Sequence, residues 1–236
     1  MNELEWREVP GGEYEIGLRE DEARDLAKLT AARAVEQAMA DPDPLHSERE
    51  SRQLAEMWGN ADYLYGQLAH SMPAHCSTLP SFAISQTPVS VADYARFMHA
   101  TGASAPTTNV RVQSAPEQPV TGISWAEAQA FASWAGAELP SEAMWEAALR
   151  PSSRSPFGAI GHDLYEWCAD AFAPYPGADM VAFGRIAPPP RGWSGTRTRR
   201  GGAIVGFPVT VVCRRGADPT LRLRDTTFRL VRRRTV

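Results

Sequence analysis

The sequence predicts a mixed fold in which capped helices are combined with short strands. Three observations lead to this prediction. Several segments repeat apolar residues at helical spacing behind a capping residue. The first 17 residues and the stretch from Asp163 onward read instead as short strands and loops, broken by glycine and proline. At 236 residues, the chain is long enough for one large domain or two small ones with a sizeable core.

The N-terminal part predicts an edge strand followed by a helical hairpin. A turn at Gly11-Gly12 interrupts the strand. The first helix spans roughly residues 20–40 and ends at a proline-rich segment, because proline cannot continue a helix. The second starts at Ser47, with Glu50 in the position of a capping box. The apolar face of the first helix holds Leu26, Leu29, Ala32, Val35 and Met39, and that of the second Leu54, Met57, Trp58, Ala61, Leu64, Tyr65 and Leu68.

Three further helices follow from the same kind of signal. They begin at Ser90, at Ser124 and at the segment Leu139-Pro140-Ser141. An acidic residue three positions after each of the first two serines completes a capping box. Trp125 and Trp145 lie on these helices, and we expect both to belong to the core. The segment 173–194 contains five prolines, which predicts a loop without regular structure.

Charge is distributed unevenly along the chain. The net charge is −4, yet from Arg185 to the end there are 13 arginines against Asp218 and Asp225, a local balance of +11 that leaves −15 for the preceding residues. One interpretation is internal pairing of a basic C-terminal segment with an acidic body. The other is a face that binds anions, because clustered arginines favour bidentate recognition of oxyanions.

Cysteine content and hydropathy bear on the compartment. Three scattered cysteines are too few for a disulfide framework. No apolar run is long enough to span a bilayer, and the acidic start MNELEWREVPGG shows no signal peptide. We therefore expect a cytoplasmic, reduced protein with no membrane partner. The sequence contains no P-loop, dinucleotide fingerprint, nucleophile elbow or HExxH motif.

Six landmarks run from one end of the chain to the other in a recognisable order. They are VPGGEYEIG (9–17), FAISQTPVSVADYARFMHATG (82–102), QPVTGISWAEAQAFASWAGAELPSEAMWEAALR (118–150), DLYEWCADAF (163–172), RRGGA (199–203) and FRLV (228–231). Their order and wording resemble the formylglycine-generating-enzyme, or sulfatase-modifying factor, superfamily. The resemblance implies an α+β, C-type-lectin-like formylglycine-generating-enzyme fold with much irregular structure. It implies one domain over 1–236, into which the helical hairpin at about 18–74 is inserted.

The same resemblance points to what is missing. Oxidase members carry two nearby cysteines shortly after the GGS-type motif, and the paired thiolates bind copper, a soft metal that needs sulfur ligands. Here that stretch reads GGAIVGFPVTVVCRRGADP, and its single cysteine, Cys213, lies outside the positions of the pair. Ile204, Val205, Phe207 and Val209 cannot ligate a metal or act as nucleophiles. We therefore expect no formylglycine-generating activity.

Calcium is the cofactor that the resemblance suggests. It carries Glu166 over as a carboxylate ligand, with the backbone carbonyls of His162 and Leu164. The Asn or Asp that family members have seven residues before this glutamate is Ala159 here, and Asp163 could compensate. Because Ca²⁺ takes six to eight oxygens, a site with so few donors would be weak. The alternative is that Glu166 accepts hydrogen bonds from a loop.

A transition-metal site is a separate hypothesis. His70, His75 and Cys76 supply nitrogen and sulfur ligands of the kind that zinc or iron uses. Their spacing matches no standard site. The oxygenase branch of the superfamily draws its iron ligands from an HxxxHxE motif in a separate helical bundle, and the sequence has no such motif.

The C-terminal segment offers a candidate ligand surface. In lectin-like members of the superfamily, the stretch between the GG and FRL motifs forms the exposed ligand surface. Arg215, Arg222 and Arg224 are the candidates for such a surface, whereas Arg214 keeps the family's spacing and is expected to be structural. Trp193 precedes an arginine cluster and could stack on a planar ligand.

Three functions remain open on this basis. The first is a non-oxidase member of the superfamily that acts as a ligand- or protein-binding scaffold module. Its partner would be a protein or a second copy on the helical hairpin, whose wide apolar face otherwise packs on the domain itself, or an anionic ligand on the arginine-rich face. The second is a divergent metal- and oxygen-dependent enzyme. The third is a polyanion or nucleic-acid binder that uses residues 191–234, with an affinity that falls steeply with salt.

Overall fold

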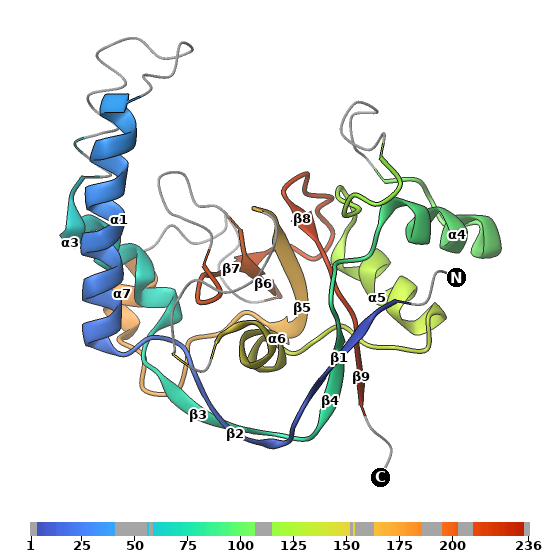
Figure 1. The fold of residues 1–236 in the computed structure, drawn as a ribbon, viewed down its shortest axis with the longest axis horizontal. Helices are drawn as coiled ribbons and strands as arrows, with labels where there is room; N and C mark the ends of the chain where they lie inside the picture. Colours follow the sequence, from blue (N-terminus) through green and yellow to red (C-terminus); the bar gives the residue numbers. More distant parts are fainter. Residues whose placement is uncertain are drawn as a thin grey trace.

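A computed structural model describes residues 4–40, 56, 59–106, 115–151, 153, 163–185, 195–202 and 210–233, with the backbone alone at 34–40, 183 and 185. It has an α+β fold, as the sequence predicts (Figure 1). Several predictions lie outside the described residues. They are the start of the second hairpin helix at Ser47, the calcium-related Ala159 and His162, the apolar segment 204–209, and Trp193.

One small sheet brings the start, the middle and the end of the chain together. Strand β4 (Phe82–Ser85) lies between β1 (Trp6–Val9) and β9 (Val231–Arg233), and both pairings are antiparallel. All four residues of β4 are buried. Beside this sheet, β2 (Gly12–Ile16) and β3 (His75–Leu79) form an antiparallel ribbon that leads into and out of the helical hairpin (Figure 1).

The second sheet contains most of the predicted site residues. Its strand order is β7 (Arg214–Ala217), β6 (Arg197–Gly201), β5 (Tyr165–Ala171) and β8 (Thr226–Thr227). β5 pairs with β8 in parallel, and the other two pairings are antiparallel. Along β6, buried residues alternate with half-buried ones, because successive side chains of a strand point to opposite faces.

The three predicted central helices are present with the predicted caps. They are α4 (Val91–Thr101), α5 (Trp125–Trp134) and α6 (Glu142–Leu149). Ser124 and Glu127 form a complete capping box. Trp145 is fully buried, as predicted. Trp125 is only partly buried: it packs against the core, its indole Nε1 donates to the carbonyl of Cys168, and a guanidinium covers the ring.

A short helix lies where the sequence predicts an irregular loop. α7 (Met180–Arg185) occupies part of the segment 173–194. Its first turn is held by Asp179, whose Oδ1 accepts from the amides of Val181 and Ala182. The prolines of this segment all lie outside the helix, so the count of prolines gave the wrong expectation for these six residues.

The helical hairpin is anchored to the body of the molecule at its base. α1 (Glu20–Ala40) has the bounds that the sequence predicts, and α3 (Ala61–Gln67) and the 3₁₀ helix η1 (Leu68–Ser71) return beside it (Figure 1). The predicted apolar face of α1 is confirmed at Leu26, which is buried, and wrong at Leu29, which is 40% exposed, and at Ala32, which is exposed. The side chains of Val35 and Met39 lie outside the described residues. The face that docks is made mostly of small residues, which allow close packing, and it holds Ala23, Leu26, Ala27, Thr30 and Ala31.

This face of α1 joins the larger of two apolar clusters. The cluster also contains Leu64 and Leu68 from the returning arm, Phe82 from β4 and Trp145 from α6. The described part of the hairpin therefore packs on the domain itself. No helix in the described ranges is long and apolar enough to cross a membrane.

Candidate functional site

The inner face of the β5–β8 sheet contains a buried network of arginines and glutamates. Arg200 of β6 is fully buried and forms an ion pair with Glu146 of α6. It also donates to the hydroxyl of Tyr175 over 2.8 Å and to the carbonyl of Val211 over 2.8 Å. The second oxygen of Glu146 accepts from Gly17 N and from Arg150 Nη1, both at 3.0 Å. One carboxylate thus connects α6 to β6 and to the end of β2.

Arg214 of β7 is the second arginine of this inner face. Its Nε and Nη2 donate to the two oxygens of Glu142 over 2.7 and 2.8 Å. Its Nη1 donates to the carbonyls of His70 and Ala173, each over 2.9 Å. The guanidinium is therefore saturated by a bidentate carboxylate and by carbonyls, a geometry that suits arginine. This agrees with the structural role predicted for Arg214.

Glu166, the predicted calcium ligand, takes part in a third pair of this kind. Its Oε2 accepts from Arg229 Nε over 2.6 Å and from Trp145 Nε1 over 2.9 Å, and its Oε1 accepts from Arg229 Nη2 over 2.7 Å. A calcium ion here would have to displace a guanidinium, and the described contacts of Glu166 do not fit that role. Asp163 is exposed on the surface. The calcium site stays a prediction.

The predicted transition-metal residues lie on two elements, His70 in η1 and both His75 and Cys76 in β3. His70 is buried edge-on against Phe172, and the ring of His75 lies 4.3 Å from that of Tyr175. Cys76 is exposed and follows His75 directly in the strand, so the two side chains point to opposite faces. The described residues contain no cluster of three or more His, Cys, Asp or Glu side chains that could hold a metal.

The remaining two cysteines are buried thiols. Cys213 is 2% exposed, and its sulfur accepts a hydrogen bond from Thr210 Oγ1 over 2.9 Å. Burial raises the pKa of Cys213, and it raises that of Cys168 well above the usual range. The thiolate is the form that binds metal and attacks electrophiles, so burial disfavours both roles at these two cysteines. Cys168 was not singled out in the sequence, since only its burial distinguishes it.

The outer face of the same sheet has a different set of arginines. Arg197 and Arg199 alternate with the buried residues of β6, so their side chains lie on this outer face. The guanidinium of Arg197 lies 4.0 Å from the centre of the Trp125 ring, and that of Arg199 lies 4.5 Å from the centre of the Tyr165 ring. Arg215 of β7 stands directly opposite Arg199. Sequence reasoning selected Arg215 and missed Arg197 and Arg199, although the alternating RTRR pattern carries the signal.

The other predicted ligand-binding residues have separate positions. Arg222 forms an ion pair with Glu127, with its Nε 3.0 Å from Oε2, and its Nη1 donates to the carbonyl of Ala105 over 3.2 Å. It therefore ties the C-terminal segment to the start of α5. Arg224 is exposed in a turn. The structure brings neither of them to Arg215 by a described contact.

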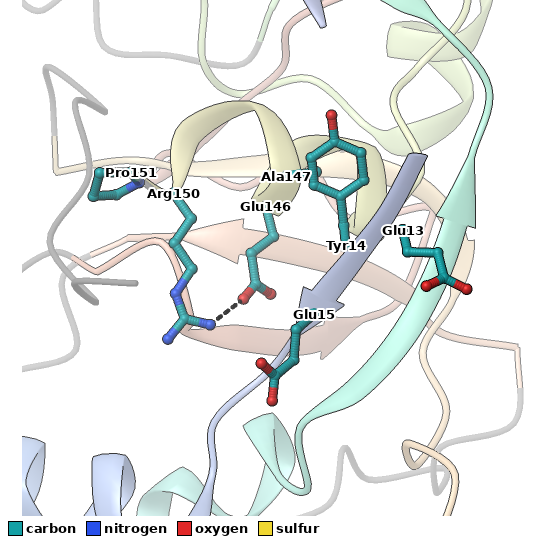
Figure 2. A pocket seen from close by; sticks show the side chains of 7 residues that line it. All are labelled: Glu13, Tyr14, Glu15, Glu146, Ala147, Arg150 and Pro151. Atoms are coloured by element: carbon teal, nitrogen blue, oxygen red, sulfur yellow. Dashed lines mark hydrogen bonds and ion pairs between the residues drawn. The ribbon is translucent and has the colours of Figure 1, made fainter. Parts of the chain in front are cut away.

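An open pocket of about 380 Å³ adjoins the inner network between β2 and α6 (Figure 2). Glu13, Tyr14 and Glu15 line it from the strand, and Glu146, Ala147, Arg150 and Pro151 line it from the helix and its end. Glu146 and Arg150 contact each other there, as the dashed line in Figure 2 marks. Glu15 is paired with Arg19. The charged groups of this pocket thus belong largely to ion pairs already made.

Internal pairing, the first interpretation of the charge asymmetry, describes part of the C-terminal segment, and the anion-binding face stays a prediction. Five of its arginines pair with glutamates of the middle of the chain, namely Arg200 with Glu146, Arg214 with Glu142, Arg222 with Glu127, Arg229 with Glu166 and Arg233 with Glu138. Internal pairing therefore accounts for these residues. It does not account for the arginines of the outer face.

Comparison with known proteins places this architecture among its relatives. A family model described as "Sulfatase-modifying factor enzyme 1-like domain" matches residues 8–160. The formylglycine-generating enzyme of Mus musculus is 26% identical over 168 residues, covering 67% of this chain and 41% of that protein. Hercynine oxygenase of Mycolicibacterium smegmatis is 25% identical over 192 residues, covering 52% and 45%. The chain spans less than half the length of these curated relatives.

Solved structures give a more complete match. PvdO of Pseudomonas aeruginosa superposes with a TM-score of 0.60 at 18% identity, covering 97% of this chain and 94% of that one. At this identity the likeness establishes the fold and no more.

Proposed function

This chain belongs to the sulfatase-modifying factor enzyme 1-like family, and from that membership we propose that it is a non-oxidase member acting as a ligand- or protein-binding scaffold module. The observation that carries the proposal is the position and burial of Cys213. It is the one cysteine in the stretch after the GG motif, it is buried, and burial raises its pKa. A protonated, enclosed thiol is a poor metal ligand and a poor nucleophile at neutral pH.

The inner network supports the same conclusion. The buried charges of Arg200, Arg214 and Arg229 are matched by glutamate carboxylates, so these groups hold helices and strands together. Buried charges are tolerated only where they are paired in this way. The frame of the family is thus stabilised without a free reactive group among these residues.

Two surfaces remain for recognition under this proposal. One is the helical hairpin, where Leu29 and Tyr63 are exposed and a protein or a second copy of the chain would dock. The other is the arginine-bearing outer face of the β5–β8 sheet. A cytoplasmic location forms part of the proposal, in keeping with three free cysteines.

Oxygen uptake tests the proposal directly. The protein would be loaded with Cu(I) and mixed with a cysteine-containing peptide, and oxygen consumption would be recorded beside that of a Cys213→Ser variant. We expect equal rates, no higher than those of copper and peptide alone. Copper-dependent uptake that the Cys213→Ser variant loses would show that the chain is an oxidase.

Metal content tests the alternative of a divergent oxygen-dependent enzyme. The name hercynine oxygenase among the relatives motivates it, and His70, His75 and Cys76 would be its candidate ligands. Protein purified without chelators would be measured by mass spectrometry for bound metals. Stoichiometric iron or copper, lost in a His75→Ala variant, would favour the enzyme over the binding module.

A further inference from the structure

Two arginines oppose each other on the outer face of the β5–β8 sheet. Arg199 of β6 and Arg215 of β7 are register partners in an antiparallel pair. Directly opposite residues project from the same face with Cβ atoms roughly 4.5–5.5 Å apart, and like charges in such positions repel each other. An arrangement of this kind costs stability unless an anion lies nearby.

The described residues supply very little negative charge to this face. Arg199 Nη1 lies 3.0 Å from Asp225 Oδ1, and that carboxylate is 57% exposed. Arg215 has no carboxylate contact in the described part of the chain, and neither has Arg197, which stacks on Trp125 and donates to the carbonyl of Ala169. Burial lowers the pKa of Arg199, Asp225 opposes that effect, and the charge of Arg215 adds to the lowering.

Both guanidiniums are nevertheless held in place. Arg199 lies over the Tyr165 ring, and its Nη1 donates to Thr226 Oγ1 over 2.7 Å. Arg215 Nη1 lies 3.3 Å from Nδ1 of His70, which is buried at the base of the hairpin. Because a guanidinium can only donate, this contact is a hydrogen bond in the His70 tautomer whose Nδ1 accepts. Preorganised donors of this kind lower the entropic cost of binding.

Donor capacity remains on both side chains. The Nε of Arg199 is buried and has no hydrogen-bond partner among the described residues. The described contact of Arg215 uses one nitrogen of three. A buried donor without an acceptor is costly, and an oxyanion that receives two or more N–H groups relieves that cost.

We propose that Arg199 and Arg215 form a binding site for a single oxyanion group, a carboxylate or a phosphate, on the outer face of this sheet. The proposal deepens the proposed binding function and rests on it, because it names the class of ligand that the module recognises. Arg197 extends the positive face along β6, and the aromatic rings of Trp125 and Tyr165 support it.

A titration followed by NMR tests the site. Inorganic phosphate, and separately acetate, would be added to ¹⁵N-labelled protein at constant ionic strength while the arginine Nε–Hε signals are recorded. We expect saturable shifts of the Arg199 and Arg215 signals. The anion that binds more tightly, phosphate or acetate, would indicate which group the natural ligand carries. Absence of any saturable shift with both anions would overturn the proposal.

Matched variants separate a built site from a diffuse positive field. Arg215→Gln should weaken anion binding about tenfold, and Arg215→Lys should weaken it by a smaller factor, since lysine keeps the charge and loses the planar fork. Arg224→Gln removes the same charge from an exposed turn and should change affinity less than about twofold. Equal losses in Arg215→Gln and Arg224→Gln would contradict a specific pair. Circular dichroism would check that each variant is folded.

Binding of heparin, a polyanion, tests whether the arginines act as an extended positive surface. Steeply salt-dependent binding of heparin, without a saturable response to phosphate or acetate, would replace the oxyanion site with a polyanion surface. The two proposals fail separately. A titration without saturable shifts would overturn the anion site and would not change the oxygen-uptake result. Copper-dependent oxygen uptake would overturn the proposed function and would not change the anion titration.

Discussion

The two faces of strands β6 and β7 carry the same residue type in very different surroundings. On the inner face, Arg200 and Arg214 are fully buried, and each has a glutamate of α6 within ion-pair distance. On the outer face, Arg199 and Arg215 are partly exposed, and of the two only Arg199 contacts a described carboxylate, the exposed one of Asp225. The comparison teaches that the supply of carboxylates, more than exposure, separates arginines that hold the fold from arginines that are available to a ligand.

Removal of an inner carboxylate should have the largest effect. Glu146→Gln would leave Arg200 buried beside a neutral amide, and loss of one partner of a buried pair typically costs about 3–5 kcal/mol. Urea denaturation of wild type and variant would measure the difference in the free energy of unfolding. Glu138→Gln is the control, because its pair with Arg233 is exposed and should contribute little. If Glu146→Gln lowered the free energy of unfolding by less than about 1 kcal/mol, the inner carboxylates would not hold the fold together and the two faces would not differ in this respect.

A glycine beside the outer face should have the next largest effect. Gly202 has a φ of +75°, and a Cβ there would lie 2.4 Å from the Tyr165 ring that supports Arg199. Gly136 has a φ of +64° with no atom within 4 Å of such a Cβ. Gly136→Ala should therefore cost about 1 kcal/mol for backbone strain, and Gly202→Ala about 2–3 kcal/mol for strain and crowding together. Equal changes in melting temperature for the two variants would argue against close packing at Tyr165.

The ion pair of Glu127 and Arg222 is less buried than the inner pairs and less exposed than the pair of Glu138 and Arg233. Its contribution to the free energy of unfolding can be measured from the dependence on pH. Burial alone would raise the pKa of Glu127, but hydrogen bonds from Ser124 and the Arg222 charge outweigh it and hold the pKa below 4.5. A carboxyl whose pKa is lower in the folded state stabilises the protein above its unfolded pKa. That stability is lost as pH falls through the folded pKa.

The measurement is the difference in unfolding free energy between wild type and Glu127→Gln as a function of pH. We expect a pH-dependent part of about 1 kcal/mol that is present at pH 6 and declines below 4.5. Glutamine can keep the capping-box bond, and the pH series separates any constant offset from the charge effect. A difference that stays constant from pH 6 to pH 3 would show that the charge of Glu127 contributes nothing.

Local signals were sufficient for the helices of this fold. The capping box at Ser124 joins groups three residues apart, so the sequence contains both partners side by side. The docking face of α1 was misjudged for a physical reason. Counting large apolar residues favoured Leu29, whereas close packing against the domain selected alanines such as Ala23 and Ala27.

The site depends on partners that are distant in the chain. Glu166 and Arg229 are 63 residues apart, and Glu142 and Arg214 are 72 apart, so only the tertiary fold decides which arginine meets which glutamate. The missing cysteine pair could be recognised by resemblance alone. The alternation of Arg199 with Arg200 is visible in the sequence, but which face is buried follows from the packing of α6 against β6.

Removal of an outer arginine should have the smallest effect on stability. Arg215→Gln removes a guanidinium that faces Arg199 across the strands, and relief of that repulsion should offset the lost contact to His70. We expect the free energy of unfolding to stay within about 0.5 kcal/mol of wild type in low salt. Phosphate should stabilise wild type more than Arg215→Gln at the same concentration, since the stabilisation by a ligand grows with its affinity for the folded state. A loss approaching that of Glu146→Gln would mean that Arg215, like Arg200, serves the fold, and would remove the distinction between the two faces.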